Sequence, residues 1–339
     1  MTWEGRRVLV TGGASFIGSH LVEELVRLGA RVRVADDLSS GDLTHLDSVR
    51  DDVEVQVGDL RHWDLATRAS AGCEVLFHLA ANHGGRGYIA THPADCANNM
   101  ALDGIVFETA LRNGVERITF ASSACVYPAP LQQQERVPLT EDMVSFERPG
   151  GACADEEYGW AKLMGELALR ALHRQHGLAT SAVRISTAYG PRESESHALI
   201  ALVAKAAIRQ DPFEIWGDGR QTRNFTYVDD VVRGLLLAAE DLSDGSAVNA
   251  GVSEFISLDR AVETVFEAIG WRPSEIRYRP DKPVGVRHRA VDGSLAKRRT
   301  GWEPRWSFER GVEATVAWFL ENRDIASLRE ELEGRLFAR

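Results

Sequence analysis

The chain of 339 residues has little of what marks several other classes of protein. It has 4 cysteines, which lie far apart and form no CxxC pair: Cys73, Cys96, Cys125 and Cys153. That spacing excludes a disulfide framework and a zinc site, so no metal is expected. No apolar run is long enough to span a bilayer, and we expect neither a signal segment nor a membrane partner. The free cysteines favour a reducing cytoplasm.

Positive side chains are outnumbered by negative ones, and the formal net charge is −11. This balance argues against nucleic acid or an anionic membrane surface as the main partner. Hydrophobic residues make up 44% of the chain, which is ample for a sizeable core. The composition therefore indicates a globular protein whose partners are small molecules or other proteins.

The first half of the chain alternates short apolar runs with amphipathic stretches. The runs occupy residues 7–12, 31–37, 53–59, 75–81 and 117–123. Between the first two runs, four apolar residues share one face of a predicted helix, and Gly29 is a plausible helix end: Ile17, Leu21, Leu25 and Leu28. This alternation predicts an α/β fold with a doubly wound, Rossmann-like parallel sheet that is covered on both faces.

The segment TGGASFIGSH, residues 11–20, follows the first predicted strand and opens the first predicted helix. Gly12 and Gly18 would let the backbone approach a pyrophosphate, and the helix N-terminus supplies N–H donors. Ser15 stands where a third glycine is expected, so the loop is expected to be slightly displaced. A plain strand–turn–helix is the alternative interpretation.

Acidic residues end the next two predicted strands. Asp36 and Asp37 end the second strand, where a carboxylate can accept hydrogen bonds from a ribose diol and repel a 2′-phosphate. This pattern favours NAD over NADP, with Asp36 as the candidate and Asp37 as a solvated loop charge. Asp59 ends the third strand and could contact the adenine edge, or it could cap a helix.

The second half of the chain is less regular. A long loop is predicted over 131–155, a helix over 158–173, a strand over 180–186, and later elements near 213–217, 227–240 and 312–320. We predict an NAD-binding domain over 1–188, to which 224–253 returns. Residues 189–223 and 254–339 are predicted to form a smaller, discontinuous α+β lobe that binds the substrate.

The sequence YGWAK places Tyr158 and Lys162 on one face of a predicted helix, at positions i and i+4. A free tyrosine has a pKa of about 10, too high for a base at neutral pH. A nearby ammonium and a positive nicotinamide ring would favour the phenolate. Tyr158 could then move a proton at a sugar hydroxyl while hydride moves to or from NAD, and Lys162 would also hold the nicotinamide ribose.

These motifs together resemble the extended short-chain dehydrogenase/reductase family, in its nucleotide-sugar branch. The similarity covers nearly the whole chain and includes TGGASFIG, VADDLSSG, GDLR, FHLAA, SSACVYP, YGWAK, AYGPR, DGRQTRNFTYVDD and GWEPR. It implies that Ser123 joins Tyr158 and Lys162 in catalysis. It also implies a homodimer, paired through the helices that start near Asn99 and Tyr158, and NAD that stays bound through turnover.

The same resemblance implies further contacts. Arg223 and Arg287 match arginines that clamp the diphosphate of a nucleotide-sugar substrate. The other implied substrate contacts are Gly84, Gly85, Ser123, Thr187 and His197. The implied cofactor contacts, besides Gly12, Gly18, Asp36 and Asp59, are Ser15, Phe16, Ile17, Leu60, Leu79, Ala80, Tyr158 and Lys162.

SSACVYP raises the question of what Cys125 does. The 4,6-dehydratases of this branch carry Asp-Glu where this chain has Ala124-Cys125, so that chemistry lacks its acid and base. SSACVYP, HGGRGYI and PVGVRHR instead resemble the GDP-mannose 3,5-epimerase family. Oxidation of a hexose at C4 makes the hydrogens on C3 and C5 removable, and a thiolate beside positive charge can serve as the base. The alternative for Cys125, as for the other cysteines, is a small buried hydrophobe.

Two departures from that family leave the reaction open. No lysine occupies the expected place opposite the cysteine, and His197, Arg192 and Lys205 are the nearest substitutes. Thr187 replaces an asparagine. The sequence therefore predicts an NAD-dependent nucleotide-sugar epimerase acting on GDP-mannose or a relative, and it leaves open whether C3, C5, both or C4 is inverted. A UDP-sugar 4-epimerase in which Cys125 has no role, and a non-catalytic NAD-binding regulator, remain the alternatives.

Overall fold

The computed structural model describes residues 1–133 and 135–330, and a seven-stranded parallel sheet forms its centre. The order across the sheet is β3-β2-β1-β4-β5-β6-β11. The strands are β1 (Arg7–Thr11), β2 (Arg31–Asp36), β3 (Val53–Val57), β4 (Val75–His78), β5 (Arg117–Ser123), β6 (Ala179–Ile185) and β11 (Asp244–Ala250). The chain reverses direction across the sheet between β1 and β4, and ligands of such sheets bind at that point, beyond the carboxyl ends of the strands.

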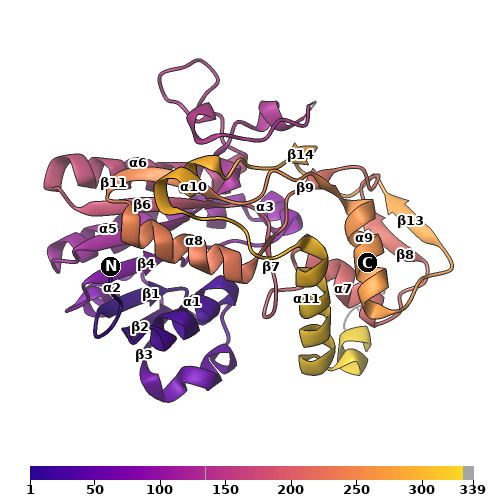
Figure 1. Cartoon of the computed structure of the whole chain (residues 1–339), viewed down its shortest axis with the longest axis horizontal. Helices are drawn as coiled ribbons and strands as arrows, with labels where there is room; N and C mark the ends of the chain where they lie inside the picture. Colours follow the sequence, from indigo (N-terminus) through magenta and orange to yellow (C-terminus); the bar gives the residue numbers. More distant parts are fainter. Residues whose placement is uncertain (134, 331–339) are drawn as a thin grey trace.

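Helices cover both faces of this sheet (Figure 1). Alternate residues along β1 separate the two layers, since Val8 and Val10 pack with one set of helices and Leu9 packs with the other. One layer holds α1 (Phe16–Arg27) and α8 (Val228–Asp241), and the other holds α2 (Trp63–Ser70), α5 (Asn99–Arg112) and α6 (Glu156–His176). The prediction of a doubly wound, Rossmann-like parallel sheet is confirmed.

Local sequence signals explain where these elements begin and end. In α1, Leu21 and Leu25 are fully buried, and the chain leaves the helix through Gly29 at a φ of +83°, a conformation that favours glycine. The long helix α6 ends in the same way at Gly177, with a φ of +70°. Each predicted strand of the sheet lies within two residues of the observed bounds at either end, except the fourth, which stops at His78 rather than at residue 81.

A smaller lobe lies beside the carboxyl ends of the strands (Figure 1). Its helices α7 (Ala198–Ala207), α9 (Leu258–Ile269) and α11 (Phe308–Asn322) pack on one another. Its strands form the parallel pair β8 (Phe213–Trp216) and β13 (Ile276–Arg279), and the set β12 (Ile256–Ser257), β9 (Thr222–Arg223) and β14 (His288–Arg289). The proposed domain boundaries stay a prediction, and residues 331–339 of the predicted lobe lie outside the described part of the chain.

Short elements join the two parts. The pair β7 (Ala188–Tyr189) and β10 (Thr226–Tyr227) lies where the chain enters and leaves the lobe. The helices α3 (Arg86–Thr91) and α4 (Pro93–Ala97) follow β4, and α10 (Ser294–Thr300) packs on α8. Among residues 1–133 and 135–330, no helix is long and apolar enough to cross a bilayer, and no cluster of side chains has the makeup of a metal site.

Candidate active site

The loop between β1 and α1 requires glycine at the two positions that the sequence singled out. Gly12 has a φ of +69°, and a Cβ there would lie 2.9 Å from the backbone nitrogen of Ala80. A Cβ on Gly18 would overlap the carbonyl oxygen of Gly12. The loop is therefore drawn tightly against the end of β4, and Ser15 precedes the helix without a side-chain capping bond, so the first N–H groups of α1 stay available.

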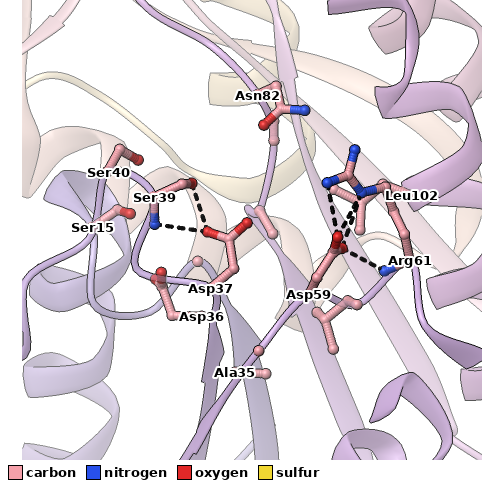
Figure 2. Close-up of a pocket in the computed structure, with 15 residues that line it drawn as sticks. Ser15, Ala35, Asp36, Asp37, Ser39, Ser40, Asp59, Arg61, Asn82 and Leu102 are labelled. Atoms are coloured by element: carbon pink, nitrogen blue, oxygen red, sulfur yellow. Dashed lines mark hydrogen bonds and ion pairs between the residues drawn. The ribbon is translucent and has the colours of Figure 1, made fainter. Parts of the chain in front are cut away.

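Asp36 holds this loop in place. Its carboxylate is 5% exposed and accepts hydrogen bonds from the backbone N–H of Ala14 at 3.0 Å and of Leu38 at 2.9 Å. Burial raises the pKa of Asp36, and these two hydrogen bonds oppose that change. A carboxylate has about four lone-pair positions, so Asp36 can still accept from a ribose hydroxyl. Asp37 is exposed, and its carboxylate accepts from the N–H and the hydroxyl of Ser39 (Figure 2).

A groove with about 470 Å³ of space runs over this end of the sheet (Figure 2). Gly12, Ser15, Asp36, Asp59, Leu60 and Ala80 line it, as the cofactor prediction requires, together with Asp37, Asn82 and Leu102, which the prediction did not include. Asp59 accepts from the Arg61 side chain at 3.0 Å and from the Arg61 backbone N–H at 2.8 Å, and the side-chain bond is the main cause of its lowered pKa. Phe16, Ile17 and Leu79, also predicted to contact the cofactor, pack against the core and do not line this groove. The tight glycine loop and the acidic rim fit a dinucleotide with a free ribose diol.

The carboxyl end of β5 meets the start of α6 beyond this groove. The Ser123 hydroxyl accepts a hydrogen bond from the N–H of Cys125 at 3.1 Å and lies within hydrogen-bonding reach of Tyr158. The N–H of Asp155 donates to the carbonyl of Cys125 at 2.8 Å, which ties α6 to the turn after β5. The fold thus brings Ser123, Cys125 and Tyr158 together as the sequence predicted.

Lys162 lies one turn beyond Tyr158 and is 2% exposed. Its Nζ is 4.5 Å from the ring centre of Phe120 and 5.8 Å from that of Tyr158. Burial lowers the pKa of Lys162, and the carboxylate of Asp103 opposes this change. Asp103 in turn accepts a hydrogen bond from the Nε2 of His78 at 2.9 Å in a buried pair.

Tyr158 is not activated by the protein alone. Burial raises its pKa, Cys125 and Asp103 add to the increase, and only the hydrogen bond with Ser123 opposes it. Lys162, whose Nζ lies 5.8 Å from the Tyr158 ring centre, is not among the groups that lower the pKa of Tyr158. A positively charged group beside the phenol is therefore needed to favour the phenolate, and a bound, oxidised nicotinamide is such a group.

Cys125 has an unpredicted partner. The Arg289 guanidinium donates from Nη1 to the Cys125 sulfur at 3.2 Å. In the ladder between β9 and β14, Arg289 stands directly opposite Arg223, so both side chains leave the same face. The sequence analysis did not single out Arg289, because its contact with Cys125 forms only in the folded chain.

The residues expected to bind substrate gather between the lobes, with one exception. A Cβ on Gly85 would overlap the carbonyl oxygen of Ser196, so the glycine segment after β4 touches the loop before α7. Thr187 has a φ of +36° and accepts from the N–H of Thr226 at 3.1 Å. Arg287 lies apart from this group and pairs with Asp218 at 2.8 Å on the surface of the lobe.

Of the three proposed substitutes for the missing lysine, two are held elsewhere. Arg192 pairs with Glu23 of α1 at 2.7 Å, and Lys205 donates to the carbonyl of Glu214 at 2.8 Å. His197 remains near the active site, because its ring centre lies 5.6 Å from that of His83 in the segment HGGRGYI. Burial lowers the pKa of His197 to about 4, so its imidazole is neutral at pH 7.

His83 links this pair of rings to the catalytic residues. Crowding by the surrounding protein lowers the pKa of His83 most, and the charges of His197 and Lys162 lower it further. The sequence analysis quoted the segment and did not single out His83, because only the folded chain brings it beside His197.

Comparisons with known proteins agree with this geometry. Residues 8–251 match the model of the NAD dependent epimerase/dehydratase family. The chain is 33% identical over 324 residues to GDP-mannose 3,5-epimerase 1 of Oryza sativa subsp. japonica, covering 94% of this chain and 82% of that protein. It is 31% identical over 320 residues to UDP-glucose 4-epimerase of Mycolicibacterium smegmatis, covering 92% and 98%.

Comparison with solved structures also finds nucleotide-sugar epimerases similar to this chain. The crystal structure of UDP-glucose 4-epimerase with UDP-glucose from Thermotoga maritima superposes with a TM-score of 0.83 at 29% identity, covering 93% of this chain and 99% of that one. The proteins similar to this chain include 3,5-epimerases, 4-epimerases, decarboxylases and 4,6-dehydratases of nucleotide sugars.

Proposed function

The chain belongs to the NAD-dependent epimerase/dehydratase family, and from that premise we propose that it inverts C3, C5 or both on GDP-mannose or a closely related nucleotide sugar. The observation that carries this proposal is the position of the Cys125 sulfur, beside Arg289 and in the same turn as Ser123. Ala124 and Cys125 also stand where a dehydratase would need an acid and a base, which supports epimerisation over loss of water.

Tyr158, Ser123 and Lys162 each have a separate role in the oxidation at C4. NAD, when bound, accepts a hydride from C4 of the sugar and later returns it. Tyr158 takes the proton of the 4-hydroxyl group, and Ser123, within hydrogen-bonding reach of that phenol, orients it. Lys162 supplies a buried positive charge one helical turn away. The resulting 4-ketone acidifies the hydrogens on C3 and C5.

Inversion then needs two proton carriers, because the proton must leave one face of the sugar and return to the other. We assign these roles to Cys125 and His197. Arg192 and Lys205 are committed to other contacts, whereas the neutral imidazole of His197 can accept or pass on a proton next to His83. Arg223, Gly84, Gly85 and Thr187 would hold the nucleotide sugar, with Arg287 at the outer end of the diphosphate if its pair with Asp218 opens.

The test is to incubate the purified protein with GDP-mannose in heavy water and to follow the sugar by NMR. Deuterium at C3 or C5, with an inverted centre, is the expected result. A product inverted only at C4, or a sugar that takes up no deuterium, would overturn the proposal.

A UDP-sugar 4-epimerase is the second candidate, favoured by the similarity to two UDP-glucose 4-epimerases. It needs Ser123, Tyr158 and Lys162 but no carbon acid chemistry, so Cys125→Ala would leave it most of its activity. A non-catalytic NAD-binding regulator is the third. It predicts that Tyr158→Phe changes no cellular function.

We also propose a homodimer in the cytoplasm. Met100 on α5 and Trp160 on α6 are 45% and 38% exposed, and these two helices pack side by side. A second copy that covers both side chains would build a four-helix interface. All 4 cysteines are free of disulfide bonds, as in a reducing compartment. Sedimentation would test the dimer, and Met100→Glu with Trp160→Glu is expected to give monomers.

A further inference from the structure

Arg289 is fixed in place by three different partners, one on each nitrogen of its guanidinium. Nε donates to the side-chain oxygen of Gln132 at 2.7 Å, Nη2 donates to Asp155 at 2.7 Å, and Nη1 donates to the Cys125 sulfur at 3.2 Å. The side chain is 11% exposed. Because Gln132 and Asp155 set the plane of the guanidinium, its third donor is aimed at the sulfur without freedom to turn away.

A neutral thiol is only a weak hydrogen-bond acceptor, so it does not explain why a buried guanidinium lies against the Cys125 sulfur. The charges around it point instead to an anion. Asp155 pairs with Arg86 at 3.3 Å as well as with Arg289 at 2.7 Å, and Arg86 also pairs with Glu156 at 2.6 Å. Within the described part of the chain no carboxylate pairs with Arg223, which donates to the backbone carbonyls of Thr222 and Val284.

The guanidinium groups of Arg86, Arg223 and Arg289 thus outnumber the carboxylates that pair with them. Burial, together with the neighbouring Arg289 and Arg86, lowers the pKa of Arg223 to about 9. The pKa of Arg289, by contrast, is raised, because Cys125 and Asp155 outweigh the effect of burial. A negative charge on the Cys125 sulfur would offset this excess of positive charge, and the Arg289 guanidinium already donates to that sulfur.

We propose that Arg289 is the counter-ion of a Cys125 thiolate and so makes Cys125 the base that removes the proton beside the ketone. This inference rests on the proposed function. In the step, an S–H bond forms as the C–H bond at C3 or C5 breaks. The electron pair of that C–H bond moves towards the ketone at C4 to give the enolate, and Arg289 is left beside a neutral thiol until the proton departs. No oxidant is consumed.

The other groups around Cys125 bear on its charge and are named for that reason. Tyr158 and Cys96 approach it from α6 and α4, and both are neutral at pH 7 because the pKa of each is raised by burial. Asp155 and Glu156, at the start of α6, are the nearby carboxylates; Asp155 pairs with Arg289 and Arg86, and Glu156 pairs with Arg86. Arg223 adds positive charge from β9.

The test measures the sulfur itself and needs no substrate. The ultraviolet thiolate band of Cys125 is obtained as the difference between the wild-type protein and Cys125→Ala, titrated over roughly pH 5 to 9. In the wild type, the band is expected to be present at pH 7. In Arg289→Met, it is expected to be largely lost at pH 7 and to appear only at higher pH, and alkylation of Cys125 by iodoacetamide at pH 7 is expected to slow by about 10-fold or more.

Arg86→Met is the matched control, because it removes a guanidinium from the same carboxylate, Asp155, without touching the sulfur. It is expected to retain the band at pH 7. Thermal unfolding and retained NAD identify variants that are folded. If folded Arg289→Met keeps the wild-type band, or if the wild type has none at pH 7, the inference is overturned even if the protein is an epimerase. If the band behaves as expected but Cys125→Ala inverts the sugar normally, Cys125 is not the base and the inference is overturned as well. If the wild type inverts neither C3 nor C5 of GDP-mannose, the proposed function fails instead.

Discussion

Gly159 packs so closely on Cys125 that a Cβ at this position would overlap the carbonyl oxygen of the cysteine. Gly159 follows Tyr158 in α6, so this contact sets how near the phenol comes to the turn after β5. The YGWAK motif therefore carries a packing requirement as well as a catalytic pair, and the glycine between the two named residues is part of it.

Gly159→Ala tests this contact. The methyl group must push α6 away from the turn, and such overpacking is expected to cost about 1–3 kcal/mol of unfolding free energy. Activity is expected to fall with it, because Tyr158 moves away from Ser123. Urea unfolding and product formation measure the two effects. The control is Gly104→Ala in α5, where the added Cβ has nothing within 4 Å and should stabilise the protein by about 0.4–1 kcal/mol. Equal effects at both glycines would contradict the interpretation.

Cys125→Ala separates the two epimerase candidates. Removal of the sulfur takes away the base for C3 and C5, so deuterium uptake at those carbons is expected to fall by roughly 100-fold or more. Oxidation at C4 needs Tyr158 and not Cys125, so a brief appearance of reduced cofactor on mixing with GDP-mannose should persist. Cys73→Ala, at a buried cysteine in the turn between α2 and β4, is the control. Unchanged deuterium uptake in Cys125→Ala would remove the thiol from the mechanism.

His197→Gln tests the second proton carrier. Glutamine can fill much of the space of the imidazole but cannot carry a proton, so inversion is expected to fall by roughly 100-fold while oxidation at C4 continues. In the wild type, the pKa of about 4 keeps His197 neutral at pH 7, and a requirement for the neutral form would make the rate fall as the pH drops towards 4. His92→Gln, the same exchange at an exposed histidine in the turn between α3 and α4, should change neither property. Normal inversion in His197→Gln would exclude this role.

Asp155→Asn tests the charge pairing behind the active site. Asp155 is 4% exposed and pairs with Arg86 and Arg289, and its loss leaves the buried Arg289 guanidinium without a carboxylate partner, whereas Arg86 keeps Glu156 at 2.6 Å. The expected cost is about 3–5 kcal/mol of unfolding free energy at pH 7. The control, Glu116→Gln, removes an exposed partner of Arg6 and should change the free energy by less than about 0.5 kcal/mol.

The pH dependence of Asp155→Asn follows from the direction of the pKa change. Burial would raise the pKa of Asp155, but Arg289 and Arg86 outweigh it and leave the pKa below its ordinary value. The stabilisation is therefore fully present above the unfolded-state pKa of about 3.9 and is lost as the pH falls through the lower, folded-state value. The difference between wild type and Asp155→Asn should shrink as unfolding is measured at pH values falling below about 4. A difference that stays constant down to low pH would contradict the pairing.

The sequence alone determined the strands of the sheet except β11, the glycine loop, and the shared helix face of Tyr158 and Lys162. Each of these depends on signals close together in the chain, such as alternating apolar runs, a glycine after a strand, or an i and i+4 spacing on a helix. Parallel strands then bring their carboxyl ends to one edge without any further information. That is why Asp36 and Ser123 both lie at that edge, as expected.

Tertiary structure alone decided the surroundings of Cys125 and His197. Arg289 stands 164 residues after Cys125 and reaches it from the other part of the fold, as His83 reaches His197, and neither contact leaves a local pattern in the chain. Tertiary structure also changed the pKa values of the catalytic groups. Burial raises the pKa of Tyr158 and lowers those of Lys162 and His197, and burial is a property of the packed chain. A sequence names the acids and bases, but the distance between charges and their access to water exist only once the two lobes have come together.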